Sequence, residues 1–310
     1  MKNEPRLYDL TDVSNPLTVL KEIDHIASMM SADFDAADIE MVYFDIISLF
    51  RGHYPGFQAS NTKYHDLEHT IAVALAAIRL MHGCFLAGIP FSHEQIFLGM
   101  CAALAHDAGL IQTVDDREGS GAKYTVGHEQ RSIDFVHGYL SERHYDSQDI
   151  EDCSQMIRCT DLNVSLQQLS IRNQGIELLC KIVGSADLLA QIADRNYLEK
   201  LLLLFQEFKE AGLPDMASEF DLLKNTENFY QNVAKKRLED DFADVARYMV
   251  NHFEQRYGVK RDLYKESIKN NLAYLRSVLA KSDDGASIRR KLRRRIKRDA
   301  VDKSYRPTTF

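Results

Sequence analysis

The sequence has few of the residues that interrupt helices. Only six prolines and fifteen glycines are spread over 310 residues. Apolar residues recur at spacings of three and four, and no run of alternating β-branched residues predicts a sheet. We therefore expect an all-α protein. Helices are predicted at residues 17–30, 36–51, 64–82, 93–106, 127–143, 149–160, 174–192, 196–211, 218–233, 236–257, 262–280 and 287–298.

Paired cysteines and long apolar runs are also lacking. The five cysteines are odd in number and form no C-x-x-C pair, so we expect reduced, buried thiols in a cytoplasmic protein. The stretch MKNEPRLYDLTD has no apolar segment of signal-peptide type. The longest apolar runs, such as FLGMCAALA, are too short to span a bilayer. These features predict a soluble protein with no transmembrane segment.

The net charge of −8 is unevenly distributed. From Ala286 onward there are ten Lys or Arg and two Asp or Glu, a net of +8, which leaves −16 for the rest of the chain. An acidic body argues against nucleic acid as the main partner. In the basic segment Ile288, Leu292 and Ile296 are four residues apart and form a narrow apolar stripe. This helix either contacts an anionic surface or an acidic partner, or docks on the protein's own acidic body.

Three regions are predicted along the chain. Residues 1–40 form an N-terminal helical extension, 41–280 a catalytic domain, and 281–310 a basic C-terminal segment. Residues 110–126, rich in Gly, Asp and Ser, are expected to form a long loop of the kind that is often functional. Left-handed glycines are expected to end helices at Gly83, Gly109 and Gly258, and N-caps are expected at Asp149 and Asp262.

The stretch TKYHDLEHT places two histidines, His65 and His69, four residues apart at the start of an apolar helical segment. Four residues are about one helical turn, so both imidazoles project from one face. They are either two ordinary histidines or a metal ligand beside a proton donor. Asp66 and Glu68 either orient these imidazoles or form an acidic first turn that the helix dipole favours.

Other histidines and carboxylates interrupt apolar helices further along. His106 and Asp107 follow LGMCAALA, His128 follows the loop, and Asp187 interrupts ELLCKIVGSADLLAQIA. Burying an ionised Asp is costly unless a cation compensates, and a divalent metal does so directly. One such residue alone is more often a hydrogen-bonded core group. Several together favour a metal site.

The order His69, His106-Asp107, Asp187 resembles the pattern of the HD-domain metal-dependent phosphohydrolases. Three segments, YHDLEHTIAVA, RCTDLNVS and VGSADLLAQIADR, are similar to the Y-H-N-x-x-H-x-x-x-V, T-D and A-D-L-S segments of class I cyclic-nucleotide phosphodiesterases. The similarity covers residues 64–195 in the family's order. It implies an HD-domain helical bundle.

The resemblance also implies roles. His69, His106, Asp107 and Asp187 would bind the first of two divalent ions (Mg, Mn, Zn or Fe), with Asp107 reaching toward the second. A metal-activated hydroxide would attack phosphorus, and His65 would be the general acid. His128 would contribute to the metal centre. Substrate-contacting or supporting roles are expected for Tyr64, Glu129, Asp161 and Gln231.

The sequence departs from the phosphodiesterases in three places. Leu110 stands where the family has a further histidine, GHEQRS replaces its E-N-H-H segment, and Gln231 matches its purine-reading glutamine by residue type only. The expected substrate is a small phosphoester, a cyclic nucleotide in the first instance, and the assembly considered is a homodimer. The alternatives are an HD phosphohydrolase acting on another nucleotide or phosphomonoester, a di-iron oxygenase, and a non-catalytic nucleotide-sensing HD domain.

Overall fold

The prediction of an all-α protein is confirmed. In a computed structural model, which describes residues 5–31, 34–213, 217–282 and 287–292, helices are joined by loops. Over these ranges no strand occurs, and extended backbone pairs only in isolated bridges between Arg51 and Ala59 and between Phe57 and Thr113. All five cysteines are free and buried.

The helices follow one another along the chain with short connections. The α-helices are α1 (Leu7–Leu10), α2 (Pro16–Met30), α3 (Ala37–Phe50), α4 (Leu67–Leu86), α5 (His93–Ala105), α6 (His128–Glu142), α7 (Ser147–Arg158), α8 (Gln174–Ala193), α9 (Tyr197–Glu210), α10 (Glu219–Phe229), α11 (Met249–Tyr257) and α12 (Leu263–Ala280). The 3₁₀ and π segments are η1 (Ala108–Leu110), η2 (Gly121–Tyr124), η3 (Leu166–Gln168), η4 (Tyr230–Ala234), η5 (Arg237–Asp241) and η6 (Val245–Tyr248).

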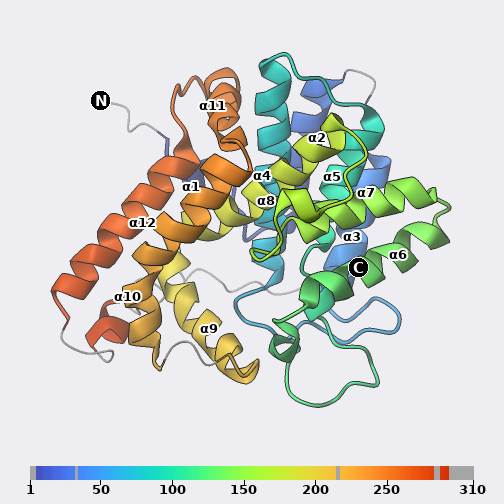
Figure 1. Cartoon of the computed structure of the whole chain (residues 1–310). Coiled ribbons are helices and arrows are strands. Elements are labelled where there is room, and N and C mark those ends of the chain that lie inside the picture. The colour runs from blue at the N-terminus through green and yellow to red at the C-terminus, as the bar shows by residue number, and fades with distance from the viewer. Residues whose placement is uncertain (1–4, 32–33, 214–216, 283–286, 293–310) are drawn as a thin grey trace.

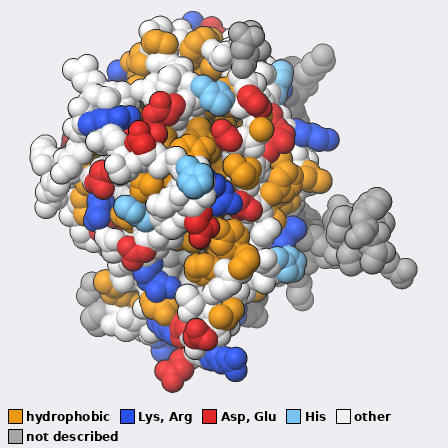
Figure 2. Space-filling model, turned by 90° about the vertical axis from the view of Figure 1, so that its right-hand side faces the viewer, with side chains coloured by type: hydrophobic (Ala, Val, Ile, Leu, Met, Phe, Trp, Pro, Cys, Tyr) orange, Lys and Arg blue, Asp and Glu red, His pale blue; other side chains and the backbone are white. Residues whose placement is uncertain are grey.

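Helices α4, α5 and α8 lie in the middle of the molecule (Figure 1), with α9, α10 and α12 to one side and α6 and α7 to the other. Helix α4 packs against α8, α5, α2 and α11. By length and composition α4 could cross a membrane, but 83% of its apolar window is buried inside the protein, as in the core helix of a globular domain. On the face drawn in Figure 2, acidic, basic and apolar side chains are interspersed.

Both ends of the described chain join the same core. Ile23 of α2 belongs to the hydrophobic cluster that contains the central helices. So do Ile288 and Leu292, each 1% exposed, and Arg289 pairs with Glu219 at 2.6 Å. Residues 287–292 therefore dock on the protein's own body, as one of the two interpretations predicted. The remainder of the predicted helix 287–298 lies outside the described residues.

Two predicted helix boundaries are confirmed. Gly258 ends α11 with a φ of +68°, and Asp262 caps α12 by accepting a hydrogen bond from the backbone N–H of Lys265. The prediction for Asp149 is wrong, because Asp146 caps α7 and accepts from the N–H of Asp149.

The predictions for Gly83 and Gly109 are also wrong, since neither glycine ends a helix in the left-handed conformation. Gly83 lies inside α4, where a Cβ atom would come 2.1 Å from the carbonyl oxygen of Tyr248. Glycine is required there so that the segment before α11 can approach α4 closely. Gly109 serves a similar close approach beside the metal centre described below.

The single helix predicted over 236–257 is divided into η5, η6 and α11, with Ala243 and Asp244 at positive φ between η5 and η6. The ring of Phe242 is fully buried and packs directly on Gly184. A Cβ atom at Gly184 would lie 2.5 Å from this ring. Apolar spacing in the sequence does not distinguish a continuous helix from one interrupted to seat a ring on another helix.

A buried pair of histidines joins α4 to α11. The Nδ1 atoms of His82 and His252 lie 3.0 Å apart, and the residues are 1% and 0% exposed. One ring must donate and the other accept, so the accepting ring is neutral. Burial lowers the pKa of His82 to about 4 and that of His252 to about 2.

We expect this pair to make the protein less stable in mild acid. Between pH 6.5 and 4 the unfolded chain takes up protons on these histidines and the folded protein does not, so the free energy of unfolding falls by up to about 1.4 kcal/mol per pH unit per residue. Urea unfolding at pH 7 and pH 4.5 measures this fall. It should shrink in the double variant His82→Leu/His252→Leu and stay unchanged in the exposed control His137→Gln. Equal falls in all three proteins would contradict the assignment.

Candidate metal centre

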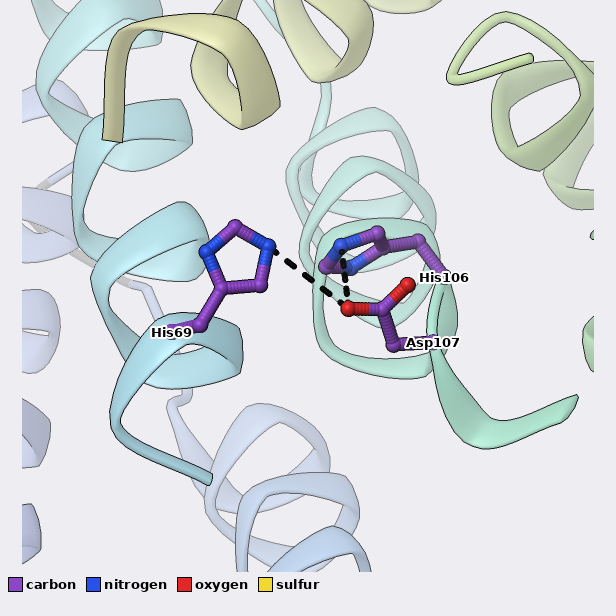
Figure 3. A group of neighbouring side chains, drawn as sticks. All are labelled: His69, His106 and Asp107. Atoms are coloured by element: carbon purple, nitrogen blue, oxygen red, sulfur yellow. Dashed lines mark ion pairs between the residues drawn. The ribbon is translucent and has the colours of Figure 1, made fainter. Parts of the chain in front are cut away.

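Three predicted ligands converge in the middle of the molecule. His69 projects from the first turn of α4 toward His106 and Asp107, which follow the last residue of α5 (Figure 3). The Oδ2 atom of Asp107 lies 3.2 Å from Nε2 of His106 and 3.6 Å from Nε2 of His69. One ligand atom from each residue falls within 4.8 Å of the others, and all three residues are buried.

Asp187 of α8 brings a further carboxylate oxygen to this cluster. Its Oδ1 lies 3.3 Å from Nε2 of His69 and 3.7 Å from Nε2 of His106. Two ligand atoms about 2.1 Å from a common ion lie about 3.0–3.4 Å apart when they subtend about 90–109°. The observed separations are close to these values, so the cluster fits a single divalent ion with little movement.

Hydrogen bonds fix which nitrogen each ring presents. Nδ1 of His106 lies 2.9 Å from the carbonyl oxygen of Ala103, and Nδ1 of His128 lies 2.9 Å from that of Thr125. A carbonyl only accepts, so both Nδ1 atoms carry the proton and Nε2 has its lone pair free. This is the arrangement that metal-binding histidines use.

Buried polar atoms at the centre lack hydrogen-bond partners. Nε2 of His106 and Oδ2 of Asp107 have none among the residues that the structure describes. Burial disfavours charge at both residues. Even so, the carboxylates of Asp107 and Asp187 raise the pKa of His106 to about 9, and His106, His65 and His128 hold the pKa of Asp107 well below its usual range. The negative charge collected here therefore attracts a proton or a cation. A divalent metal satisfies the orphaned atoms directly.

Glycines bring His128 to the other side of Asp107. Gly127 precedes α6 with a φ of +85°, and a Cβ at Gly109 would come 2.0 Å from the carbonyl oxygen of His128. As a result Nε2 of His128 lies 3.3 Å from Oδ1 of Asp107, the oxygen that faces away from His106. Glu129 lies beside it, with Oε2 3.5 Å from Nδ1 of His128. Asp107 therefore stands between His69 and His106 on one side and His128 on the other.

His65 is held by a carboxylate that the sequence analysis missed. Nδ1 of His65 lies 2.7 Å from Oε2 of Glu207 on α9. The other oxygen, Oε1, accepts from the backbone N–H groups of Lys63 and Tyr64, each at 2.7 Å. Burial opposes ionisation, but the hydrogen bond from His65 and those backbone groups keep the pKa of Glu207 below its ordinary value. In the sequence, Glu207 follows Leu204 by three residues and therefore shares a face of the predicted helix with an apolar residue. That position was the signal that could have pointed to Glu207.

Asp66 is the N-cap of α4. Its carboxylate accepts from the backbone N–H of His69 at 2.8 Å, and it lies 3.8 Å from Nζ of Lys200. The acidic residue in the first turn of α4 is Glu68. Glu68 lines a second cavity, described below.

A cavity of about 420 Å³ opens beside the cluster. Of the predicted supporting residues, Tyr64, Glu129 and Asp161 line it, and the end of the long loop, at Thr125, forms part of its wall. Gln231 does not line it and is exposed on η4. Much of the remaining lining is apolar, with Asn225 and Thr226 beside Leu201, Leu204, Phe208, Leu213, Leu222 and Phe229.

Arg237 supports the wall that carries Asp161. Its Nη2 donates to the carbonyl oxygens of Cys159, Asp161 and Val164, and Nη1 pairs with Asp241 at 2.9 Å. This contact could not be predicted from the sequence, because it joins η5 to a turn distant in the chain.

Comparison with known proteins places the chain in a family. Residues 37–247, more than half of the chain, match the Npun_R2479-like family model, and the chain belongs to this family. The search of curated proteins found no match. Among solved structures, the fold is similar to the phosphodiesterase domain of the RhoPDE fusion protein from the choanoflagellate Salpingoeca rosetta. The TM-score is 0.53 at 13% sequence identity, over 88% of this chain and 93% of that chain.

Removing the central carboxylate should remove the metal. Asp107→Asn keeps the shape of the side chain but loses its charge, so we expect the bound Mn or Zn measured by elemental analysis after dialysis to fall at least tenfold. The helical circular dichroism signal should not change. Asp161→Asn, which lines the same cavity outside the cluster, is the matched control and should keep its metal. Equal metal content in the two variants would contradict the site.

Proposed function

We propose that this protein is an HD-domain, metal-dependent hydrolase of a small phosphoester, with a cyclic nucleotide as the preferred substrate. The observation that carries the proposal is the cluster of His69, His106, Asp107 and Asp187 beside a cavity whose other lining residues are largely apolar. The similarity of the fold to a phosphodiesterase domain supports it. The free, buried cysteines support a cytoplasmic location.

In this proposal the cluster would hold one divalent cation, and Asp107 and His128 would contribute to holding a second. When bound, the ions supply Lewis acidity to the phosphoryl oxygens and lower the pKa of a water molecule. The chain's own contribution is to fix the ligands. Asp107 offers one oxygen to each side, and the hydrogen bonds to the carbonyls of Ala103 and Thr125 hold the two imidazoles with Nε2 facing inward.

His65 is proposed as the general acid that protonates the leaving oxygen. It lines the cavity, and its ring centroid lies 6.1 Å from that of His69 and 6.0 Å from that of His128. Glu207 fixes the orientation of its ring by accepting from Nδ1, which leaves Nε2 to deliver the proton. A sensor without turnover has no need of this hydrogen-bonded pair, so the pair favours an enzyme.

The apolar part of the cavity is proposed to hold the base. Phe208 and Phe229 offer aromatic faces, and Asn225 offers an amide that can hydrogen-bond a base edge. Gln231 is not available for this purpose because it lies outside the cavity. A phosphomonoester with an apolar group fits the same walls, and for that reason a substrate panel is needed.

Turnover of a phosphoester panel tests the proposal. We expect hydrolysis of a cyclic mononucleotide or bis-p-nitrophenyl phosphate with Mn or Mg, and its loss on chelation. Under the same conditions His65→Asn should keep its metal and lose about 10²–10⁴-fold in kcat. If the wild-type protein with full metal turned over no member of the panel, the enzyme assignment would be wrong and the sensor would replace it.

Glu207→Gln tests the positioning of His65. The variant keeps the shape of the side chain but removes the carboxylate that orients the ring of His65, so we expect kcat to fall about 10–100-fold with metal content and KM little changed. Glu210→Gln, one turn later on α9 and bonded to the backbone of Ser120, is the control. Equal losses in kcat for both variants, or loss of metal in Glu207→Gln, would contradict the role.

A further inference from the structure

A second cavity, of about 250 Å³, shares no lining residue with the catalytic cavity. Its walls come from residues 7–14 of the N-terminal segment, from α4, and from the end of α8 near Asp194. It shares only His69 with the cluster described above. Nothing in the proposed hydrolysis uses it.

Arg79 of α4 lies at this cavity and is 2% exposed. Its Nη1 donates to the hydroxyl of Tyr264 at 3.2 Å and its Nη2 to Oγ1 of Thr11 at 2.9 Å. Its Nε has no partner, and within the described part of the chain no carboxylate oxygen comes within 4.0 Å of the guanidinium. By contrast Arg237, which is 5% exposed, pairs with Asp241.

Both hydrogen-bond partners of the buried guanidinium are neutral hydroxyls, and Glu22, whose charge acts on it, is itself bonded to Tyr257 and Arg256. Taking a cation out of water is costly unless an anion compensates. Arginine presents a planar fork of donors that matches carboxylate and phosphate groups. An anion that reached Nε from the cavity would therefore gain both a hydrogen bond and an opposite charge.

Other residues at the cavity support an anionic ligand. Arg195 stacks over the ring of Tyr8 at 5.0 Å and adds a second positive charge to the wall. Of the three acidic residues that line the cavity, Asp194 pairs with Lys200 at 2.8 Å, Asp12 accepts from Ser14, and the charge of Glu68 acts on Lys200. Apolar side chains cover much of the remaining wall, among them Leu7, Val13, Ala72, Leu75 and Ala190.

We propose that this cavity binds a small organic anion. Its carboxylate or phosphate group pairs with Arg79, and its short apolar body lies between α4 and α8 under the N-terminal segment. Because residues 7–14 form one wall, the ligand also ties this segment to the two helices that carry His69 and Asp187.

Calorimetric titration of the full-length protein, freed of metal by chelation, tests the proposal. The probes are hexanoate, hexyl phosphate and inorganic phosphate, with hexanamide as the uncharged match of hexanoate. We expect hexanoate or hexyl phosphate to bind one to one and at least tenfold more tightly than hexanamide. Comparing the two organic anions identifies the preferred acid group, and inorganic phosphate shows whether the apolar body is required. Without metal, these measurements are independent of the hydrolytic proposal.

Variants assign the binding to this cavity. Arg79→Gln should weaken it at least tenfold, and Ala193→Leu, which fills the cavity without changing charge, should do the same. Arg143→Gln, an arginine paired with Asp45 elsewhere, is the control and should bind normally. Hydrogen exchange of residues 7–14 should slow when the ligand binds. The proposal is overturned if none of the three anions binds saturably, or if binding persists in Ala193→Leu.

Discussion

The structure is organised around the carboxylate of Asp107, which is 2% exposed in the centre of an apolar helical bundle. A carboxylate in that setting is tolerated only when positive charge surrounds it. His69 and His106 approach one of its oxygens and His128 approaches the other. A cation bound by these groups would compensate the buried charge of Asp107 and occupy the free ligand atoms. The candidate metal site and the packing of the core therefore depend on each other.

The elements that build the site come from distant parts of the chain. Each is positioned by a specific contact with the backbone. Asp66 caps α4 and sets the direction in which His69 leaves the first turn. The lack of a side chain at Gly109 lets α6 approach closely enough for His128 to reach Asp107. Glu207 draws α9 onto the segment before α4 through two backbone N–H groups as well as through His65.

The helical class was predicted correctly from the sequence. The candidate ligands that the structure brings together were also identified, because a His or Asp that interrupts an apolar helical segment can be recognised from its neighbours in the chain. Glu207 was not predicted, since a glutamate on an amphipathic helix looks solvent-exposed until its partner is known. Gln231 was chosen by residue type, and its exposure on η4 depends on how π and 3₁₀ segments divide the region after α10. Likewise Gly109 looked like a helix end, and its close neighbour lies on another helix.

The central claim is that one divalent ion binds between α4, the end of α5 and α8. A crystal structure of the protein soaked with Mn or Zn, with anomalous data collected at the metal edge, tests it most directly. The account predicts an anomalous peak about 2.0–2.3 Å from Nε2 of His69, Nε2 of His106 and the carboxylates of Asp107 and Asp187. A fully soaked crystal with no peak there, or with its strongest peak on other residues, would contradict the account.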